Sequence, residues 1–391
     1  MIDEEAIAFA WQHRDEDIAE FSLSKHLGKH RIAILQQLEG LHIARTKWGY
    51  LLDYPHFAYP PKLNCEQSSS SVTANYKAQL VGKSKSIVDL TGGMGVDTLS
   101  FSNVAERVDY VEFNTDLFEL TKRNFAILGK KNIFCHNCDC TNWLNNHTQT
   151  FDIIYIDPAR RNAFGKKMVG FSSCQPNILE IIDFLVERSN LVVIKASPMI
   201  DLKIATQQLG YATDIHIVAV NNECREILFL CRKKTEDNPL QIHCADIHFG
   251  AIHTISFTAT GEQATTLLTA NEVSQYLYEP NASIMKSGCF KQLSTQTGLP
   301  QLGRNSHLYT STELLPNFPG RTFKVIAQSP LTVKAIKKQL PSMKAHVISR
   351  NYPIKATQLQ QQLRIAEGGD SYVIATTVGK IKTGIIATRI N

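Results

Sequence analysis

The chain has 391 residues, of which 43% are hydrophobic, so it is long enough to build two or three domains with real cores. No apolar run approaches the length needed to cross a membrane, and the acidic first residues lack the charged-then-apolar pattern of a signal peptide. Nine cysteines, an odd number in a long chain, argue against a disulfide framework, and we expect a cytoplasmic protein.

The net charge of +5 is unevenly distributed along the chain. Residues 321–391 hold twelve Lys and Arg side chains against two acidic ones, a net charge of +10 that leaves −5 for the rest. A basic region on an otherwise acidic protein indicates a polyanionic partner, most simply a nucleic acid. The alternative is a charged surface that only keeps the protein soluble.

The first 75 residues predict a helical domain, because apolar side chains recur there at helical spacing and strand-type alternation is absent. Near its end, Ser68–Ser71 precede a helical pattern and offer an N-cap.

From Ile87 onward, short apolar strands alternate with helices. The predicted strands are Ile87–Leu90, Val108–Glu112, Ile133–Cys135, Asp152–Asp157, Leu191–Lys195, Asp214–Val218 and Arg225–Cys231. The predicted helices are Val96–Val104, Leu117–Leu128, Ile178–Glu187 and Leu202–Leu209. A short segment with Asn221 and Asn222 separates the last two strands, so we expect a hairpin. This order predicts an α/β fold with a mostly parallel, doubly wound sheet and one reversed edge strand.

The second half of the chain predicts smaller α+β domains. A polar linker at 233–239 precedes strand-like runs within Ile247–Thr258 and a helix near Ala270–Tyr278. The end predicts strand Phe323–Ala327, helix Leu331–Leu340, strand Ala345–Ser349, helix Ala356–Glu367, strand Ser371–Thr377 and strand Lys380–Arg389. We therefore expect four domains, with bounds 1–75, 76–235, 236–320 and 321–391.

The segment Ile87–Gly95, IVDLTGGMG, carries the most information about function. A short strand ends at Asp89 and breaks into a glycine-rich turn, and the next strand ends at Glu112, 20 residues beyond Gly92. Nucleotide-type sites need this layout, since glycines let the backbone approach the ligand and the second acid accepts hydrogen bonds from ribose hydroxyls. The alternative is an ordinary strand–turn–helix in which the glycines serve tight packing.

The glycine pattern differs from the dinucleotide-binding fingerprint, because Thr98 stands where a third small residue is expected. The loop region also carries two acids, Asp89 and Asp97, which would repel a pyrophosphate. A ligand with a cationic end and an amino group would be attracted instead. We therefore expect S-adenosylmethionine (SAM), with its sulfonium and amino-acid moiety, rather than NAD.

Further segments complete a pattern that resembles class I SAM-dependent methyltransferases, and more closely the bacterial methyltransferase family with a C-terminal THUMP-like domain. These segments are DLTGGMGVDT (Asp89–Thr98), VEFN (Val111–Asn114), CDCTNW (Cys138–Trp143), DPARR (Asp157–Arg161), IKASPMIDL (Ile194–Leu202), SSSSVTANYKA (Ser68–Ala78) and YEPNASIMKSG (Tyr278–Gly288). The resemblance covers nearly the whole chain. It implies a seven-stranded Rossmann-like methyltransferase sheet in residues 76–235 and a THUMP-like domain in 321–391, with a ferredoxin-like fold as one option for 236–320.

The resemblance also implies roles for individual residues. Asp89 and the Thr91–Gly95 backbone would receive the methionine part of SAM, Glu112 the ribose hydroxyls and Asp139 the adenine amino group. The expected cofactor-binding residues are Asp89, Thr91, Gly92, Gly93, Gly95, Asp97, Glu112, Asn114, Asp139 and Asp157.

Asp157 ends the fourth predicted strand, where open α/β sheets place their ligands. We expect it to be catalytic together with Arg160, with Asp157 orienting or deprotonating the acceptor. In amino-methylating relatives an acid or amide is followed by Pro-Pro-aromatic, whereas Ala159 and Arg160 stand here, which argues against amine methylation of a flipped base. The Arg160 guanidinium can instead stack or hold a phosphate, or form a surface ion pair. The expected substrate-binding residues are Pro158, Arg161, Lys195 and Ser197.

Two cysteine patterns suggest other chemistry. Carbon-5 pyrimidine methylation needs a thiol nucleophile, and Cys174 lies in a predicted loop after the fourth strand, while Ser197 stands where some such enzymes carry cysteine. The run from Cys135 to Cys140 lacks the second separated ligand pair typical of zinc sites, so we expect no metal there.

The sequence therefore predicts a cytoplasmic SAM-dependent methyltransferase of structured RNA, such as tRNA or rRNA. True THUMP domains bind RNA, so the resemblance implies that the basic C-terminal domain holds the substrate. Two alternatives remain open. The acceptor could be a protein or a small molecule, or the chain could be a non-catalytic RNA-binding factor that keeps a SAM fold.

Overall fold

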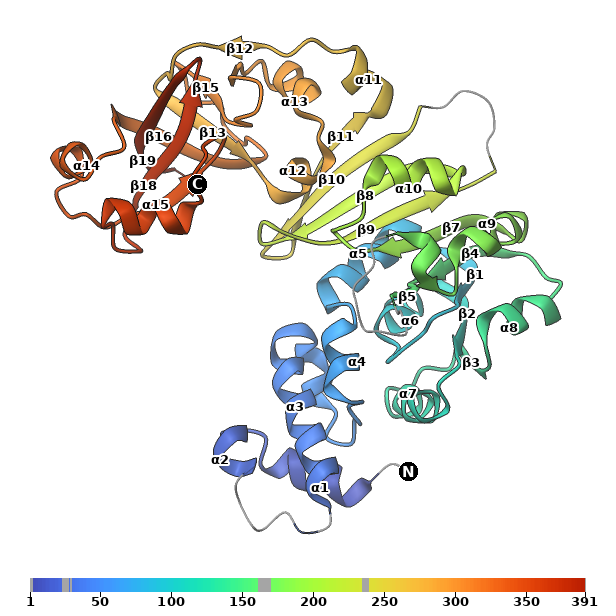
Figure 1. Ribbon diagram of the computed structural model, residues 1–391. Coiled ribbons are helices and arrows are strands. Elements are labelled where there is room, and N and C mark those ends of the chain that lie inside the picture. Colours follow the sequence, from blue (N-terminus) through green and yellow to red (C-terminus); the bar gives the residue numbers. More distant parts are fainter. Residues whose placement is uncertain (1–2, 23–27, 29, 161–169, 234–238, 391) are drawn as a thin grey trace. The chain divides into compact units, whose positions relative to one another are not determined.

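The computed structural model describes residues 3–22, 28, 30–160, 170–233 and 239–390 (Figure 1). The chain divides into two compact units. The first comprises Met1–Asp214 and Glu226–Asp237, and the second comprises Ile215–Arg225 and Asn238–Asn391. Within the described residues, no helix combines the length and the apolar character that a membrane span requires.

Helices form the N-terminal part of the first unit, as predicted. They are α1 Glu4–Gln12, α2 Ile18–Ser22, α3 Arg31–Lys47, the 3₁₀ helix η2 Gly49–Asp53, α4 Lys62–Gln67 and α5 Ser71–Val81. The side chain of Ser70 caps α5 by accepting a hydrogen bond from the backbone N–H of Thr73, which confirms the N-cap expected in the serine cluster. The core of these helices surrounds the fully buried Trp48 and includes Met94 and Val96. The helical part therefore supports the glycine-rich loop directly.

The α/β region contains a mostly parallel sheet, as predicted. Its strands are β1 Ser84–Asp89, β2 Ala105–Glu112, β3 Ile133–Asn137, β4 Phe151–Ile156, β7 Ser189–Ala196, β8 Ala212–Val220 and β9 Glu223–Cys231, in the order β8-β9-β7-β4-β1-β2-β3. Strands β1, β2, β3, β4 and β7 run parallel, and β9 pairs antiparallel with β7. The reversed strand β9 is not at the edge, contrary to the prediction, because β8 lies beyond it. The two strands turn at Asn221 and Asn222, which both have positive φ.

Helices connect these strands at nearly the predicted positions. They are α6 Val96–Phe101, α7 Thr115–Ile127, α9 Ile178–Glu187 and α10 Leu202–Leu209. An additional helix, α8 Cys140–Asn146, is not predicted from the sequence, because seven residues are too few to show a helical period. Since parallel strands end at the same edge of a sheet, the residues that follow β1, β2, β3 and β4 converge there.

The second unit contains a further hairpin and a separate sheet. Strands β10 Gln241–His248 and β11 Ala251–Thr258 pair antiparallel, and β10 lies next to β8, so that the strand order that contains β8 has nine strands. The separate sheet has the order β12-β14-β15-β13-β16-β19-β18-β17, with strands β12 Thr269–Ala270, β13 Tyr276–Pro280, β14 Gln301–Leu302, β15 Tyr309–Ser311, β16 Gly320–Ser329, β17 His346–Ser349, β18 Ser371–Val378 and β19 Ile381–Arg389. The helices are α11 Ala259–Ala264, α12 Ala282–Ser287, α13 Phe290–Thr297, α14 Val333–Gln339 and α15 Ala356–Leu363.

The β-α-β-α-β-β order predicted for the C-terminal residues is confirmed by β16, α14, β17, α15, β18 and β19. The helix predicted near Ala270–Tyr278 is wrong, because β12 and β13 occupy the two ends of that segment. Leu277 and Val273 have helical spacing, but both pack into the core of the second sheet, where Leu277 lies opposite Phe323 of β16. Pairing with β16 therefore outweighed the local helical pattern.

Candidate active site

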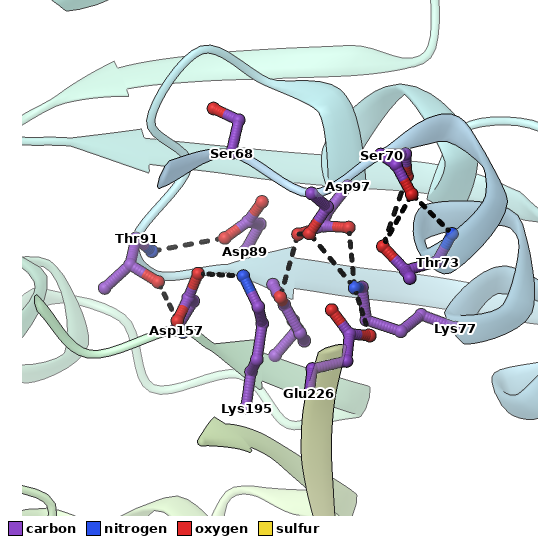
Figure 2. A network of polar contacts seen from close by, with 12 residues as sticks. Ser68, Ser70, Thr73, Lys77, Asp89, Thr91, Asp97, Asp157, Lys195 and Glu226 are labelled. Carbon is purple, nitrogen blue, oxygen red and sulfur yellow. Dashed lines mark hydrogen bonds and ion pairs between the residues drawn. The ribbon is translucent and has the colours of Figure 1, made fainter. Parts of the chain in front are cut away.

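The glycine-rich loop begins at a buried acid. Asp89, the last residue of β1, has an exposed fraction of only 1%. Its Oδ1 accepts a hydrogen bond from the backbone N–H of Thr91 at 3.2 Å (Figure 2), and its Oδ2 accepts one from the hydroxyl of Thr98 at 2.7 Å. Asp89 therefore ties the start of the loop to the first turn of α6, and it shapes the loop from beneath.

The glycines are required by close packing beneath the loop. A Cβ atom at Gly92 would lie 2.1 Å from the ring of Tyr110, and one at Gly95 would lie 2.5 Å from the ring of Phe125. Gly95 also has a φ of 80°, a conformation that side chains disfavour. The packing interpretation of the glycines is thus correct for these two positions, and it is compatible with a ligand above the loop.

Glu112 braces the loop from the end of β2. Its Oε2 accepts a hydrogen bond from the backbone N–H of Gly93 at 3.0 Å, and its Oε1 accepts one from the N–H of Asn114 at 2.8 Å. Asn114 itself caps α7. Between these two residues, Phe113 keeps 61% of its surface exposed, a feature that the sequence pattern did not single out. An acid and an exposed ring therefore lie next to the loop.

Asp139 and Asp157 follow the next two strands. Asp139 is exposed and caps α8, since its Oδ1 accepts hydrogen bonds from the backbone N–H groups of Thr141 and Asn142. Asp157 follows β4, and its backbone N–H donates to the hydroxyl oxygen of Thr91 at 2.7 Å (Figure 2). The carboxylates at the ends of β1 and β2 and those after β3 and β4 thus lie along one edge of the sheet.

Lys195, near the end of β7, pairs with Asp157. Its Nζ lies 2.6 Å from Oδ2 of Asp157, and the side chains are 13% and 36% exposed, respectively. Burial alone would lower the pKa of Lys195, but the charges of Asp157, Glu226 and Asp97 raise that pKa above its usual value. Lys195 is therefore a permanent ammonium group beside a partly exposed carboxylate.

A small pocket opens beside this pair. Its lining residues are Asp157, Pro158, Gly170, Phe171, Cys174, Lys195, Ala196, Ser197 and Ile200. The structure thus brings together four residues expected from sequence to bind the acceptor or act on it, namely Asp157, Pro158, Lys195 and Ser197. It places Cys174, the candidate thiol nucleophile, in the same pocket.

A buried charge network lies beside Asp89 and Asp157 (Figure 2). The Nζ atom of Lys77, a fully buried residue, lies 2.7 Å from Oε1 of Glu226 and 3.2 Å from Oδ1 of Asp97, and it donates to the hydroxyl of Ser69 at 3.1 Å. The other oxygen of Asp97 accepts hydrogen bonds from Ser69 and from Tyr155 of β4. Asp97, expected to bind the cofactor, is therefore engaged in the interior.

The pKa of Asp97 shows that the network favours its charged form. Burial raises this pKa, but the charges of Lys77 and Lys195 and the hydroxyl groups of Ser69 and Tyr155 bring it below the ordinary value. The sequence does not predict that Lys77 and Glu226 belong to this network. The one available signal is that Lys77 shares a helix face with the buried residues Thr73, Ala74 and Ala78.

Two predicted residues lie outside what the structure describes. Arg161 falls in the segment 161–169, and the side chain of Arg160, whose backbone belongs to the two-residue strand β5 Ala159–Arg160, is also undescribed. The cysteines near β3 behave as thiols, since burial raises the pKa of Cys135 and Cys140 to about 11. Within the described ranges, no cluster of His, Cys, Asp or Glu has the composition of a metal site.

We expect the substitution Asp89→Asn to change the pH dependence of stability. Burial raises the pKa of Asp89 from 3.8 to about 7, although the Thr98 hydroxyl partly opposes this. Because the folded protein binds this proton more tightly than the unfolded chain does, wild-type stability should fall as the pH rises from about 4 to about 7. Urea unfolding measures this effect: relative to wild type, the free energy of unfolding of the variant should be higher at about pH 8 than at about pH 5. An equal difference in stability between variant and wild type at both pH values would contradict a raised pKa for Asp89.

Comparison with known proteins gives two family matches, both within the second unit. Residues 276–319 match a ferredoxin-like domain family and residues 320–389 match a THUMP domain-like family. The crystal structure of a candidate methyltransferase from Porphyromonas gingivalis W83 is 27% identical, with a TM-score of 0.88, and covers 99% of this chain and 98% of that one. An uncharacterized RNA methyltransferase from Thermotoga maritima is 28% identical over 157 residues. That alignment covers 36% of each chain, so this protein spans about a third of its length.

Proposed function

We propose that this chain, which has a methyltransferase fold and a C-terminal THUMP-like domain, transfers the methyl group of SAM to structured RNA. The observation that carries this proposal is the carboxylate edge, where a glycine loop braced by Glu112 adjoins the Asp157–Lys195 pair. The full-length similarity to the Porphyromonas gingivalis protein supports the same class of reaction.

The residues at the loop fit the chemistry of SAM. Acids along the edge suit a sulfonium and an ammonium group, and they disfavour the pyrophosphate of a dinucleotide. Glu112 and Asn114 would hold the ribose hydroxyls, Asp139 the adenine amino group, and the exposed ring of Phe113 would cover one face of the adenine. SAM supplies an electrophilic methyl group, while Gly92, Gly93 and Gly95 let the backbone approach it.

The acceptor would enter the pocket beside Asp157. The Lys195 ammonium fixes the orientation of the Asp157 carboxylate, which can then accept a hydrogen bond from the acceptor nucleophile. Pro158 and Ser197 line the same pocket and would position the acceptor. Because methyl transfer is an in-line displacement, positioning of this kind would supply much of the catalysis.

RNA as the substrate rests on two observations. The C-terminal residues carry the basic excess and match a THUMP domain-like family. The Thermotoga maritima relative is described as an RNA methyltransferase. Phosphate contacts from the basic residues would supply affinity and make binding dependent on salt concentration.

The test is transfer of tritium from labelled SAM to total RNA from cells that lack this gene. We expect label in RNA of defined size, which would identify the modified species. SAM binding without label in any RNA, and label instead in protein or small molecules, would replace the proposed substrate. RNA binding without formation of S-adenosylhomocysteine would favour the non-catalytic alternative.

We expect the substitution Glu112→Gln to weaken SAM binding by roughly tenfold to a hundredfold, because a charge-assisted hydrogen bond contributes about 1.5–3 kcal/mol. Glutamine keeps the size of the side chain and one acceptor oxygen for the loop. Calorimetric titration with SAM measures the effect. Asp116→Asn, an exposed acid in the first turn of α7, is the matched control and should change the affinity less than twofold.

A further inference from the structure

Three segments of the second unit that the methyl-transfer site does not use meet at one buried acid. Glu279 lies on β13, within the segment YEPNASIMKSG, and its side chain is 1% exposed. Arg321 lies directly opposite it on β16, and Arg350 follows β17. Both arginines pair with this one carboxylate.

The geometry fixes both guanidinium groups. Nε and Nη2 of Arg321 donate to Oε2 of Glu279, and Nε and Nη2 of Arg350 contact Oε1 at 2.8 Å and 2.7 Å. One negative charge thus holds two positive charges, so the cluster keeps a net charge of +1. The side chains of Arg321 and Arg350 remain 26% and 36% exposed.

A second loop lies beside Arg350. A Cβ atom at Gly303 would lie 3.7 Å from the carbonyl oxygen of Thr377, whose hydroxyl donates to the carbonyl oxygen of Asn351 at 2.8 Å. The loop 303–307 therefore adjoins the loop at 350–351. Each of the two loops carries an Arg-Asn pair, and Arg304 is exposed.

Two backbone conformations in these loops are unusual. His307 and Asn351 have φ angles of 53° and 51°, which non-glycine residues adopt mainly where the surrounding structure imposes them. Nδ1 of His307 is buried and has no hydrogen-bond partner among the described residues. Burial, and then the charge of Arg350, lower the pKa of His307. The loop therefore adds a neutral ring beside a fixed cationic group.

We propose that Arg321 and Arg350, held by Glu279, bind one phosphodiester group of the RNA, with Arg304 at the margin of the site. A planar guanidinium matches two oxygens of a phosphate, and its prior fixation by Glu279 reduces the entropy lost on binding. The choice of RNA as the source of the phosphate rests on the proposed function, whereas the anion site itself does not.

The test uses the full chain and a fluorescein-labelled RNA hairpin, with anisotropy measured between about 50 and 200 mM KCl. Arg350→Gln should weaken binding roughly tenfold at the lower salt concentration and reduce the slope of log K against log [salt] by about one. Arg350→Lys should keep the slope and still weaken binding, because lysine keeps the charge and loses the fork. Lys83→Gln, at an exposed base just before β1 and outside the basic C-terminal residues, is the control of equal charge.

Arg304→Gln tests the site without disturbing the buried Glu279 cluster, since Arg304 is exposed and is not one of the two arginines that pair with Glu279. It should also lower the salt slope. Equal losses of RNA affinity for Arg350→Gln and Lys83→Gln, or unchanged affinity for Arg350→Gln, would overturn the site. If wild type methylates RNA while Arg350→Gln binds normally, the site fails and the proposed function stands. If wild type binds RNA through Arg350 and never methylates it, the anion site stands and the proposed function fails.

Discussion

Replacing Lys77 by methionine is expected to lower the free energy of unfolding of the first unit by about 3–5 kcal/mol, because it leaves buried carboxylates without their cation. Lys77 is fully buried and joins α5 to Asp97 of α6 and to Glu226 of β9. Methionine fills a similar volume, so the loss would arise from charge rather than from a cavity. Denaturant unfolding followed by tryptophan fluorescence reports this unit, since all three tryptophans lie within its first 143 residues.

The matched control for this prediction is Lys83→Met, because Lys83 is exposed close to the start of β1. It should change stability by less than about 0.5 kcal/mol. The double variant Lys77→Met/Glu226→Gln should lose less free energy of unfolding than its two single variants lose together, since it removes one of the unpaired carboxylate charges along with the cation. Additive effects, or a loss below about 1 kcal/mol for Lys77→Met, would show that the buried network does not stabilise the loop region.

Most of the fold follows from the period of the apolar residues. Helices α9 and α10 have the bounds predicted, and each strand predicted for the α/β region overlaps an observed strand, because alternation of strands and helices is a local pattern. The failures are also local. Helix α8 is too short to show a period, and the segment ending in β13 reads as a helix until its pairing with β16 is known. Both depend on contacts that the local sequence does not contain.

The candidate site divides in the same way. Glu112 and Asp157 could be placed at the sheet edge, because each ends a recognisable strand and parallel strands share an edge. The pairing of Lys77 with Glu226 joins residues 149 positions apart and could not be predicted from spacing. Asp97 illustrates the consequence, since its position in the loop predicts a ligand, while its buried partners Ser69, Tyr155 and Lys77 could not be predicted from spacing.

Asp157→Asn is expected to lower the rate of methyl transfer by about 10²-fold or more while leaving SAM affinity within about threefold. Asparagine keeps the size of the side chain and removes the negative charge that faces both Lys195 and the acceptor pocket. Nζ of Lys195 lies 2.6 Å from Oδ2 of Asp157 and holds the carboxylate in place. We therefore expect Asp157 to orient the acceptor, and single-turnover rates at saturating SAM and RNA measure this.

The pH profile separates orientation from proton removal. If Asp157 orients the acceptor, Asp157→Asn should lower the rate by the same factor across the pH range, whereas a general base would make the loss depend on pH. Cys174→Ser and Ser197→Ala test the other polar side chains of the pocket, and both should retain at least about a third of the rate. A complete loss in Cys174→Ser with a mild effect of Asp157→Asn would instead establish a thiol nucleophile, and hence attack on a pyrimidine carbon.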